Sequence, residues 1–242
     1  MNILLISGHG QGDCGAVGNG YKEANLVREI VPKLKNKLST YANVDIFDMN
    51  KNMYKFLKSG NTFNFKNYDY VLEIHFNACV NDVKGDGKTT GTEILIHSTE
   101  LSYNVEKNIV NNISALGFKN RGVKTRTNLQ NMNVCKKRYG TSYALLETCF
   151  IDDKDDMKLY ISKKDDVINA IANGIISGFN LKKVNAVSEV KELSSVNDIV
   201  WELSHRGIIT DKNLWLHKLQ EDRNSYHLAR KCINYIIKNT PS

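Results

Sequence analysis

Residues 4–24 read LLISGHGQGDCGAVGNGYKEA, an apolar run that breaks into a segment containing six glycines. The run over Ile3–Ser7 is rich in branched apolar residues and predicts a buried strand. The glycine-rich segment ends near Tyr21, where a helical pattern begins. A strand, a polar loop and a helix in this order predict one unit of an α/β fold, with the loop at an edge of the sheet.

The alternation of apolar runs and helical patterns continues to about residue 181. Short runs rich in branched residues predict strands over Ile3–Ser7, Val44–Asp48, Tyr70–Phe76, Glu93–His97 and Tyr143–Thr148. Apolar residues at helical spacing predict helices over Glu23–Leu38, Glu100–Leu116 and Val167–Phe179. We therefore expect residues 1–181 to form an α/β domain, with a mainly parallel twisted sheet and helices on both faces.

The sequence changes character after Leu181. Residues 188–242 predict three short helices and no strand, and so a small all-α domain. The first helix begins at the capping residue Ser195 and ends at Gly207. The junction is expected at Lys182–Ser188. A module of this size is marginally stable alone, so we expect it to dock or to form a homodimer.

The overall composition indicates which partners and which cellular compartment suit the protein. The formal net charge of +7 favours anionic partners. The lysines are scattered and no basic run interleaves with aromatic residues, so we do not expect nucleic-acid binding. Five cysteines without a CxxC pair argue against a disulfide scaffold and fit a reducing compartment. The N-terminus lacks a basic segment and no apolar stretch has the length of a membrane span, so we expect a cytoplasmic protein without membrane insertion.

The glycine loop offers one alternative function. Residues 10–15 match the dinucleotide-binding pattern G-x-G-x-x-G and follow a predicted strand. In such sites the helix opens inside the motif, but here Gly18 and Gly20 delay it. The acidic residue expected about 20 positions later is also absent. Nucleotide binding is therefore the weaker interpretation of this loop.

Polar side chains follow several predicted strands at their carboxyl ends. His9 follows the first strand, His75 ends another, Glu147 ends a third, and Glu23 opens the first helix. Ligands of open parallel sheets bind beyond these strand ends, so we expect the four side chains to converge. Two histidines and one glutamate form an attested catalytic zinc set, and a further carboxylate is needed to move protons. We interpret His9, Glu23 and His75 as Zn²⁺ ligands and Glu147 as the proton shuttle.

Two further residues belong to this hypothesis. His97 also ends an apolar run and competes with His75 as a ligand. Asn77 stands two residues after His75, where it either orients the ligands or substrate or makes a structural turn.

Four blocks of sequence resemble the zinc-dependent N-acetylmuramoyl-L-alanine amidases of the amidase-3 type. They are SGHGQGDCGAVGNGYKEANL (7–26), EIHFNA (73–78), GTEILIH (91–97) and ALLETCFIDDKDD (144–156), and the resemblance covers about residues 1–181. It implies zinc ligands at His9, Glu23 and His75 and a catalytic glutamate at Glu147. The implied reaction cleaves the amide between the lactyl group of muramic acid and L-alanine in peptidoglycan. The family pattern D-P-G is Asp13-Cys14-Gly15 here, which leaves the detail of the substrate groove open.

The C-terminal segment is similar to the small helical modules of some phage endolysins that bind the walls of Gram-positive hosts. This similarity implies an anionic cell-wall polymer as a partner, which suits the basic charge. An endolysin waits in the cytoplasm of the infected host until a holin opens the membrane, and then reaches the wall.

Two other functions stay open. Cys14 or Cys149 could pair with His75 in a cysteine-dependent wall endopeptidase, although the neighbouring Glu147 would raise the pKa of a thiol at Cys149. The chain could also be a non-catalytic protein that binds the wall or a nucleotide.

Overall fold

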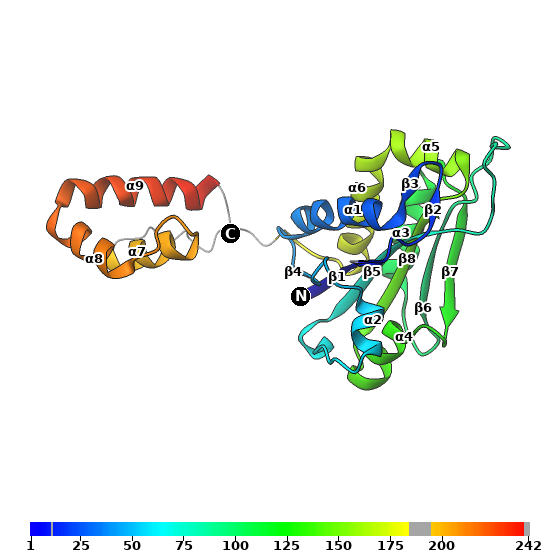
Figure 1. Cartoon of the computed structure of the whole chain (residues 1–242), viewed down its shortest axis with the longest axis horizontal. Helices are drawn as coiled ribbons and strands as arrows, with labels where there is room; N and C mark the ends of the chain where they lie inside the picture. The colour runs from blue at the N-terminus through cyan, green and yellow to red at the C-terminus, as the bar shows by residue number, and fades with distance from the viewer. Residues whose placement is uncertain (11, 184–194, 240–242) are drawn as a thin grey trace. The chain divides into compact units, whose positions relative to one another are not determined.

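Six strands form the central sheet of the N-terminal part, in the order β4-β1-β5-β8-β6-β7 (Figure 1). Strands β4, β1, β5 and β8 run parallel to one another, β6 is antiparallel to β8, and β7 is parallel to β6. The strands are β1 (Asn2–Ser7), β4 (Asn43–Ile46), β5 (Tyr70–Asn77), β6 (Thr92–His97), β7 (Asn120–Arg126) and β8 (Ser142–Phe150). The predicted mainly parallel sheet is confirmed.

The computed structural model describes residues 1–10, 12–183 and 195–239. The chain divides into two compact units between Lys183 and Val184. The predicted start of the second unit at residue 188 lies outside the described residues. The assignment of separate functions to the two parts stays a prediction.

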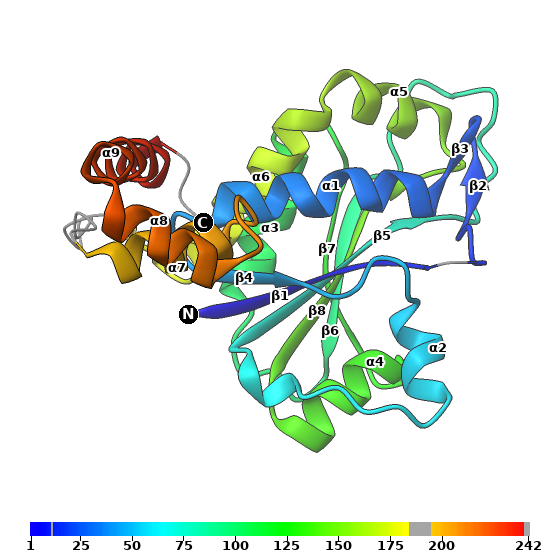
Figure 2. The same cartoon turned by 60° about the vertical axis from the view of Figure 1, so that its left-hand side comes forward.

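Helices cover both faces of the sheet (Figure 2). One face packs against α1 (Glu23–Leu38), α3 (Asn104–Ser114) and α6 (Lys164–Gly178), and the other packs against α2 (Met53–Lys58) and α4 (Gln130–Asn133). Along β1, Ile3 and Leu5 belong to the first core while Leu4 and Ile6 belong to the second. Alternate side chains of a strand point to opposite faces, so a continuous apolar run is required where both faces are covered.

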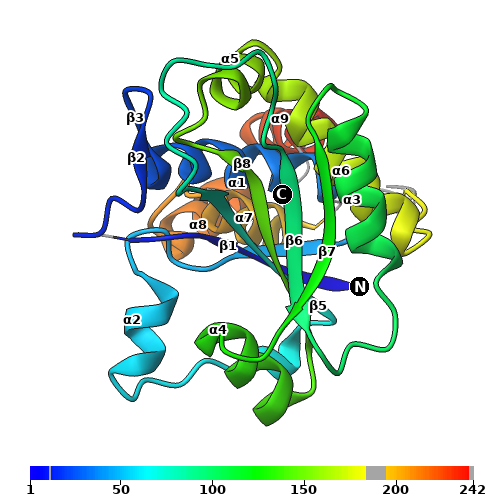
Figure 3. The same ribbon diagram turned by 90° about the vertical axis from the view of Figure 1, so that its right-hand side faces the viewer.

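The remaining elements are short. They are the strand pair β2 (Val17–Gly18) and β3 (Tyr21–Lys22), helix α5 (Lys154–Ser162), a 3₁₀ turn at Phe65–Asn67 and a π-helical turn at Val134–Arg138. Sequence periodicity did not predict these short elements, nor α2, α4 and β7. Strand β7 is an edge strand whose residues are partly exposed, and Gly122 interrupts it (Figure 3). Without an apolar run, such an edge strand has little periodic signal.

The second unit contains three helices in its described part, α7 (Val196–His205), α8 (Lys212–Glu221) and α9 (Arg223–Asn239). The Ser195 hydroxyl accepts a hydrogen bond of 3.1 Å from the Asp198 N–H, which caps α7 as predicted. Gly207 follows α7 with a left-handed φ of 68°. A separate apolar core joins the helices through Ile199, Val200, Leu203, Ile209, Leu219 and Ile233. The predicted three-helix all-α region is confirmed.

The five cysteines all lie in the described part of the chain, and each is a free thiol. Across residues 1–10, 12–183 and 195–239, no helix has the length and apolar character needed to span a bilayer.

Candidate metal centre

The loop after β1 places His9 at the carboxyl edge of the sheet. Its backbone adopts a left-handed φ of 67°, which is uncommon for a residue with a side chain. The His9 ring meets the His75 ring edge to face, with 5.0 Å between the centroids. His9 Nε2 lies 2.9 Å from Glu23 Oε2, and Nδ1 lies 3.2 Å from Asp13 Oδ1. The strained loop therefore presents an imidazole to two carboxylates.

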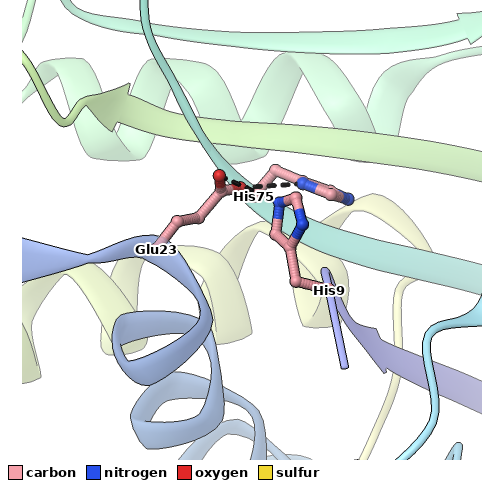
Figure 4. Close-up of side chains that lie close together, drawn as sticks. All are labelled: His9, Glu23 and His75. Carbon is pink, nitrogen blue, oxygen red and sulfur yellow. Dashed lines mark hydrogen bonds and ion pairs between the residues drawn. The ribbon is translucent and has the colours of Figure 1, made fainter. Parts of the chain in front are cut away.

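Glu23 is the first residue of α1, and it joins three segments of the chain. Its Oε1 lies 2.8 Å from His75 Nδ1 and accepts a 3.0 Å hydrogen bond from the Phe76 N–H. Its Oε2 accepts a 2.9 Å hydrogen bond from the Ala16 N–H. Although burial would raise the pKa of Glu23, its hydrogen bond to His75 and its close contact with His9 hold that pKa well below the ordinary value. Glu23 is therefore a buried carboxylate fixed in place from both sides (Figure 4).

His75 lies near the end of β5, on the face of the sheet that also carries Glu73 two residues earlier. Its Nδ1 faces Glu23, and its Nε2 lies 3.0 Å from Glu73 Oε1. Burial would lower the pKa of His75, but hydrogen bonds to Glu23 and Glu73 raise it well above the ordinary value. At His9, burial likewise would lower the pKa, but the close contact and the charge of Glu23 raise it.

Glu147 is the direct neighbour of His75 across the parallel pair β5–β8. Its Oε2 is buried and has no hydrogen-bond partner among the described residues. Burial raises the pKa of Glu147 from 4.5 to about 7, although the charge of His75 acts in the opposite direction. A carboxyl group with this pKa can take up and release a proton near neutral pH.

The donor set of His9, Glu23 and His75 fits a metal ion. One possible ligand atom from each side chain lies within 4.8 Å of those from the other two. Both ring nitrogens of His9 are buried, and neither makes a well-aligned hydrogen bond within the described residues. Two imidazoles and a carboxylate are ligands that zinc accepts in catalytic sites. The structure thus brings together the three predicted ligands, while their role as ligands stays a prediction.

The competing ligand His97 is in the wrong place for this cluster. It ends β6, which runs antiparallel to β8, so His97 lies at the opposite edge of the sheet. It is buried there, and its Nδ1 lies 2.8 Å from the Thr99 hydroxyl. A strand parallel to the others, as expected from the sequence, would place His97 at the same edge as His75. Because β6 runs antiparallel to β8, its carboxyl end lies at the opposite edge.

The start of β6 supplies a residue that sequence reasoning missed. Glu93 pairs with Glu147 in the β6–β8 register, and its Oε2 lies 2.5 Å from both Arg121 Nε and Lys124 Nζ. The Asn77 side-chain amide donates a 3.3 Å hydrogen bond to Glu93 Oε1. Asn77 Oδ1 accepts from the Ala78 N–H at 2.8 Å, which is a local turn contact. The predicted substrate role of Asn77 stays a prediction.

The glycine loop is poorly suited to bind a phosphate. The first backbone N–H groups of α1 are already used, because Glu23 N–H donates to Ala16 C=O at 2.9 Å and Ala24 N–H donates to Cys14 C=O at 3.1 Å. A phosphate at a helix N-terminus needs such groups free, and it would also meet the Glu23 carboxylate.

The sequence profile described as "N-acetylmuramoyl-L-alanine amidase", of the Amidase_3 type, matches residues 3–177 of this chain. The chain belongs to this amidase family. All the site residues described above lie inside the matched region, and the second unit lies beyond it.

Individual relatives of the amidase chain agree with this assignment. The chain is 29% identical over 192 residues to "Probable autolysin PH" of Staphylococcus aureus. The match covers 73% of this chain and 38% of that protein. It is 29% identical over 206 residues to "Endolysin" of Bacillus phage SPP1, covering 78% of this chain and 70% of that protein. The chain thus spans well under half the length of the staphylococcal relative.

Solved structures share the fold. The catalytic domain of the CD27L endolysin targeting Clostridia difficile matches with a TM-score of 0.57 and 24% identity, over 73% of this chain and 97% of that one. The CwlD amidase from Clostridioides difficile, solved with the GerS lipoprotein, matches with a TM-score of 0.60 and 22% identity, over 74% and 98%. At this identity the likeness shows the amidase-3 fold.

Two glycines of the amidase loop provide a matched test of the cluster. Gly15 and Gly12 both have left-handed φ angles, 65° and 76°. A Cβ at Gly15 would lie 2.6 Å from His9 Cδ2 and 2.7 Å from Glu23 Oε2, whereas a Cβ at Gly12 meets nothing within 4 Å. We expect Gly15→Ala and Gly12→Ala each to lower the free energy of unfolding by about 1–2 kcal/mol, because both force a left-handed alanine.

Only Gly15→Ala should also weaken metal binding, because it displaces His9 or Glu23. Zinc titration in competition with a chelator, together with denaturant unfolding of both variants, separates the two effects. Equal zinc affinity in the two variants would show that the ligands tolerate the intrusion.

The pKa shifts at the amidase site predict how the metal-free protein responds to pH. Because folding raises the pKa of Glu147 from 4.5 to about 7, the unfolded state ionises first as the pH rises. This group therefore removes up to about 3 kcal/mol of stability between those pH values. His75, with its raised pKa, acts in the same direction, since its contribution is complete below pH 6.5 and is lost as the pH rises through the folded value. Glu23, with its lowered pKa, contributes stability above pH 4.5 that is lost as the pH falls.

Urea unfolding of chelator-treated protein at a series of pH values measures this profile. Glu147→Gln should flatten the fall between pH 4.5 and 7. A wild-type profile that rises across this range contradicts the burial of an acid at Glu147.

Proposed function

We propose that this chain is a zinc-dependent peptidoglycan hydrolase that cleaves the amide bond between the lactyl group of N-acetylmuramic acid and L-alanine. The observation that carries the proposal is the convergence of His9, Glu23 and His75 inside the region matched by the amidase family. These three residues come from a loop, a helix start and a strand end that are far apart in the sequence. Such convergence suits a metal ion that keeps an open position for chemistry.

His9, Glu23 and His75 would hold the Zn²⁺ ion. When bound, zinc lowers the pKa of water towards neutrality and polarises a carbonyl oxygen. Glu23 places a negative charge between the two rings, and its backbone hydrogen bonds to Ala16 and Phe76 keep it there. The protein thus contributes a preformed set of ligands.

Glu147 would move the protons. It would accept a proton from the attacking water and return it to the amine of the departing L-alanine. Its position beside His75 and the burial that raises its pKa in the metal-free protein support a role in proton transfer. Glu93 lies beside Glu147 in the β6–β8 pair and forms ion pairs with Arg121 and Lys124. After burial, the negative charge of Glu93 is one of the influences that raise the pKa of Glu147.

A cavity of about 240 Å³ adjoins the cluster on the α2 and α4 side of the sheet. His9, His75, Asn52, Tyr54, Gln130 and Asn131 contribute to its walls. We assign this cavity to the substrate, with Asn77, two residues after His75 in β5, as a further contact.

The second unit would bind the anionic polymer of a Gram-positive wall, alone or as a homodimer. It lies outside the family match and has its own apolar core, which supports a separate role. The relative named "Endolysin" from Bacillus phage SPP1 supports a phage origin. Such a protein would wait in the host cytoplasm until a holin releases it to the wall.

Digestion of purified peptidoglycan tests the proposed reaction. We expect new L-alanine amino termini, no new reducing sugars, and loss of activity with a zinc chelator that added zinc restores. New reducing ends would indicate a glycosidase. Activity that is lost when thiols are blocked but is kept in the presence of a chelator would indicate a cysteine peptidase. Against that outcome, Cys149 is fully buried, and burial raises its pKa well above the ordinary value. Wall binding without cleavage would indicate a non-catalytic protein.

A further inference from the structure

Glu73 is a buried carboxylate that the proposed reaction leaves without a role. It is 5% exposed and points to the face of the sheet where Val71, Met132 and Tyr143 form an apolar core. An ionised group in such surroundings is destabilising unless it is paired and hydrogen-bonded. If this position served only to pack the core, an apolar residue there would avoid the free energy of removing a carboxylate from water.

The partners of Glu73 fix its orientation. The Asn131 side-chain amide donates to both carboxylate oxygens, at 3.3 and 3.0 Å, and the Tyr143 hydroxyl donates to Oε2. The remaining contact of Oε1 is His75 Nε2 at 3.0 Å. Asn131 comes from α4 and Tyr143 from β8, so two separate elements hold one carboxylate against the His75 ring.

The two nitrogens of His75 face two different carboxylates. Nδ1 faces Glu23, its neighbour in the proposed ligand set, and Nε2 faces Glu73. A neutral imidazole carries one proton, so the nitrogen that binds a metal must be the one without it. A carboxylate can only accept, so in the metal-free protein Glu23 and Glu73 each favour a proton on the ring nitrogen that they face. A metal ion bound between Glu23 and His75 would take the place of the Nδ1 proton, while Glu73 keeps the other proton on Nε2.

The geometry points to Glu73 as a positioning residue that holds His75 in the Nε2–H tautomer and so prepares Nδ1 to bind zinc. This inference rests on the proposed zinc function. Carboxylates that accept from the second ring nitrogen of a metal-bound histidine fix both the tautomer and the ring orientation. Asn131 and Tyr143 act one step further out, because their hydrogen bonds are to Glu73.

The test compares two buried glutamates in the full-length chain. In Glu73→Gln the amide both donates and accepts, so it no longer dictates which ring nitrogen is protonated. We expect this variant to bind zinc about 10–100-fold more weakly than wild type in competition with a chromogenic chelator. The control is Glu106→Gln, because Glu106 is 4% exposed, accepts from the Tyr70 hydroxyl at 2.9 Å and belongs to the opposite face of the sheet. Glu106→Gln should leave zinc affinity unchanged.

A second measurement does not depend on either variant folding. The ¹⁵N shifts of the His75 imidazole in zinc-loaded wild-type protein should show the proton on Nε2 and the metal on Nδ1. The inference is wrong if Nδ1 carries the proton, if Glu73→Gln binds zinc as tightly as wild type, or if Glu106→Gln weakens binding equally. Wild-type protein that takes up no zinc would instead overturn the proposed function, and this inference with it.

Discussion

Glu147→Gln is expected to lower the rate of amide cleavage by about 10²–10⁴-fold, the usual contribution of a general acid–base residue. Glutamine keeps the size of the side chain but cannot exchange a proton near neutral pH. Glu147 Oε2 is buried without a hydrogen-bond partner in the described part of the chain, and burial raises the pKa of this carboxyl to about 7. Release of soluble wall fragments by purified protein, followed with saturating substrate, measures the loss.

The zinc content of Glu147→Gln should equal that of wild type, because Glu147 is not among the three clustered ligands. Glu106→Gln, a buried carboxylate on the opposite face of the sheet, should retain full activity. Normal lysis by Glu147→Gln would remove the proton-transfer role from this residue. Loss of zinc together with activity would show that Glu147 is a ligand instead.

His75→Ala is expected to weaken zinc binding by more than the roughly 10–100-fold that loss of a ligand's own hydrogen-bond partner causes. The substitution removes one of three ligands and also leaves the buried carboxylates of Glu23 and Glu73 without their shared ring. Metal analysis after dialysis, with chelator competition for the affinity, gives the result independently of activity.

His97→Ala is the matched control, because both histidines end apolar strand runs. His97 lies at the opposite edge of the sheet, and its ring contacts Thr99 instead of the Glu23 cluster. This variant should keep its zinc affinity even if its stability falls. Equal loss of zinc in the two variants would mean that the metal binds elsewhere.

Much of the N-terminal fold follows from local periodicity. Buried strands such as β1 and β5 are continuous apolar runs, and α1 begins and ends at the predicted residues Glu23 and Leu38. Helix α3 is shorter than predicted, since residues 100–103 lie before it. The short helices and the edge strand β7 were not predicted, because each buries too few side chains to produce a hydrophobic periodicity in the sequence.

The site was predicted as far as parallel topology allows. His9 follows β1, while His75 and Glu147 lie towards the carboxyl ends of the parallel strands β5 and β8. These ends share one edge of the sheet, so order along the chain was enough to bring the three residues together. The prediction included His97 as a competitor because it assumed the same direction for its strand. The structure instead brings Glu93, at the start of that strand, next to Glu147.

The sequence by itself determined the strand–loop–helix unit, the amidase family and the residues capable of binding zinc, because these depend on local patterns and residue types. Only the tertiary structure decided the reversed direction of β6, the burial of Glu147 Oε2 and the contact of Glu73 with His75. Strand direction and burial arise from pairing between segments distant in the chain, and hydrophobic periodicity carries no information about which segments pair.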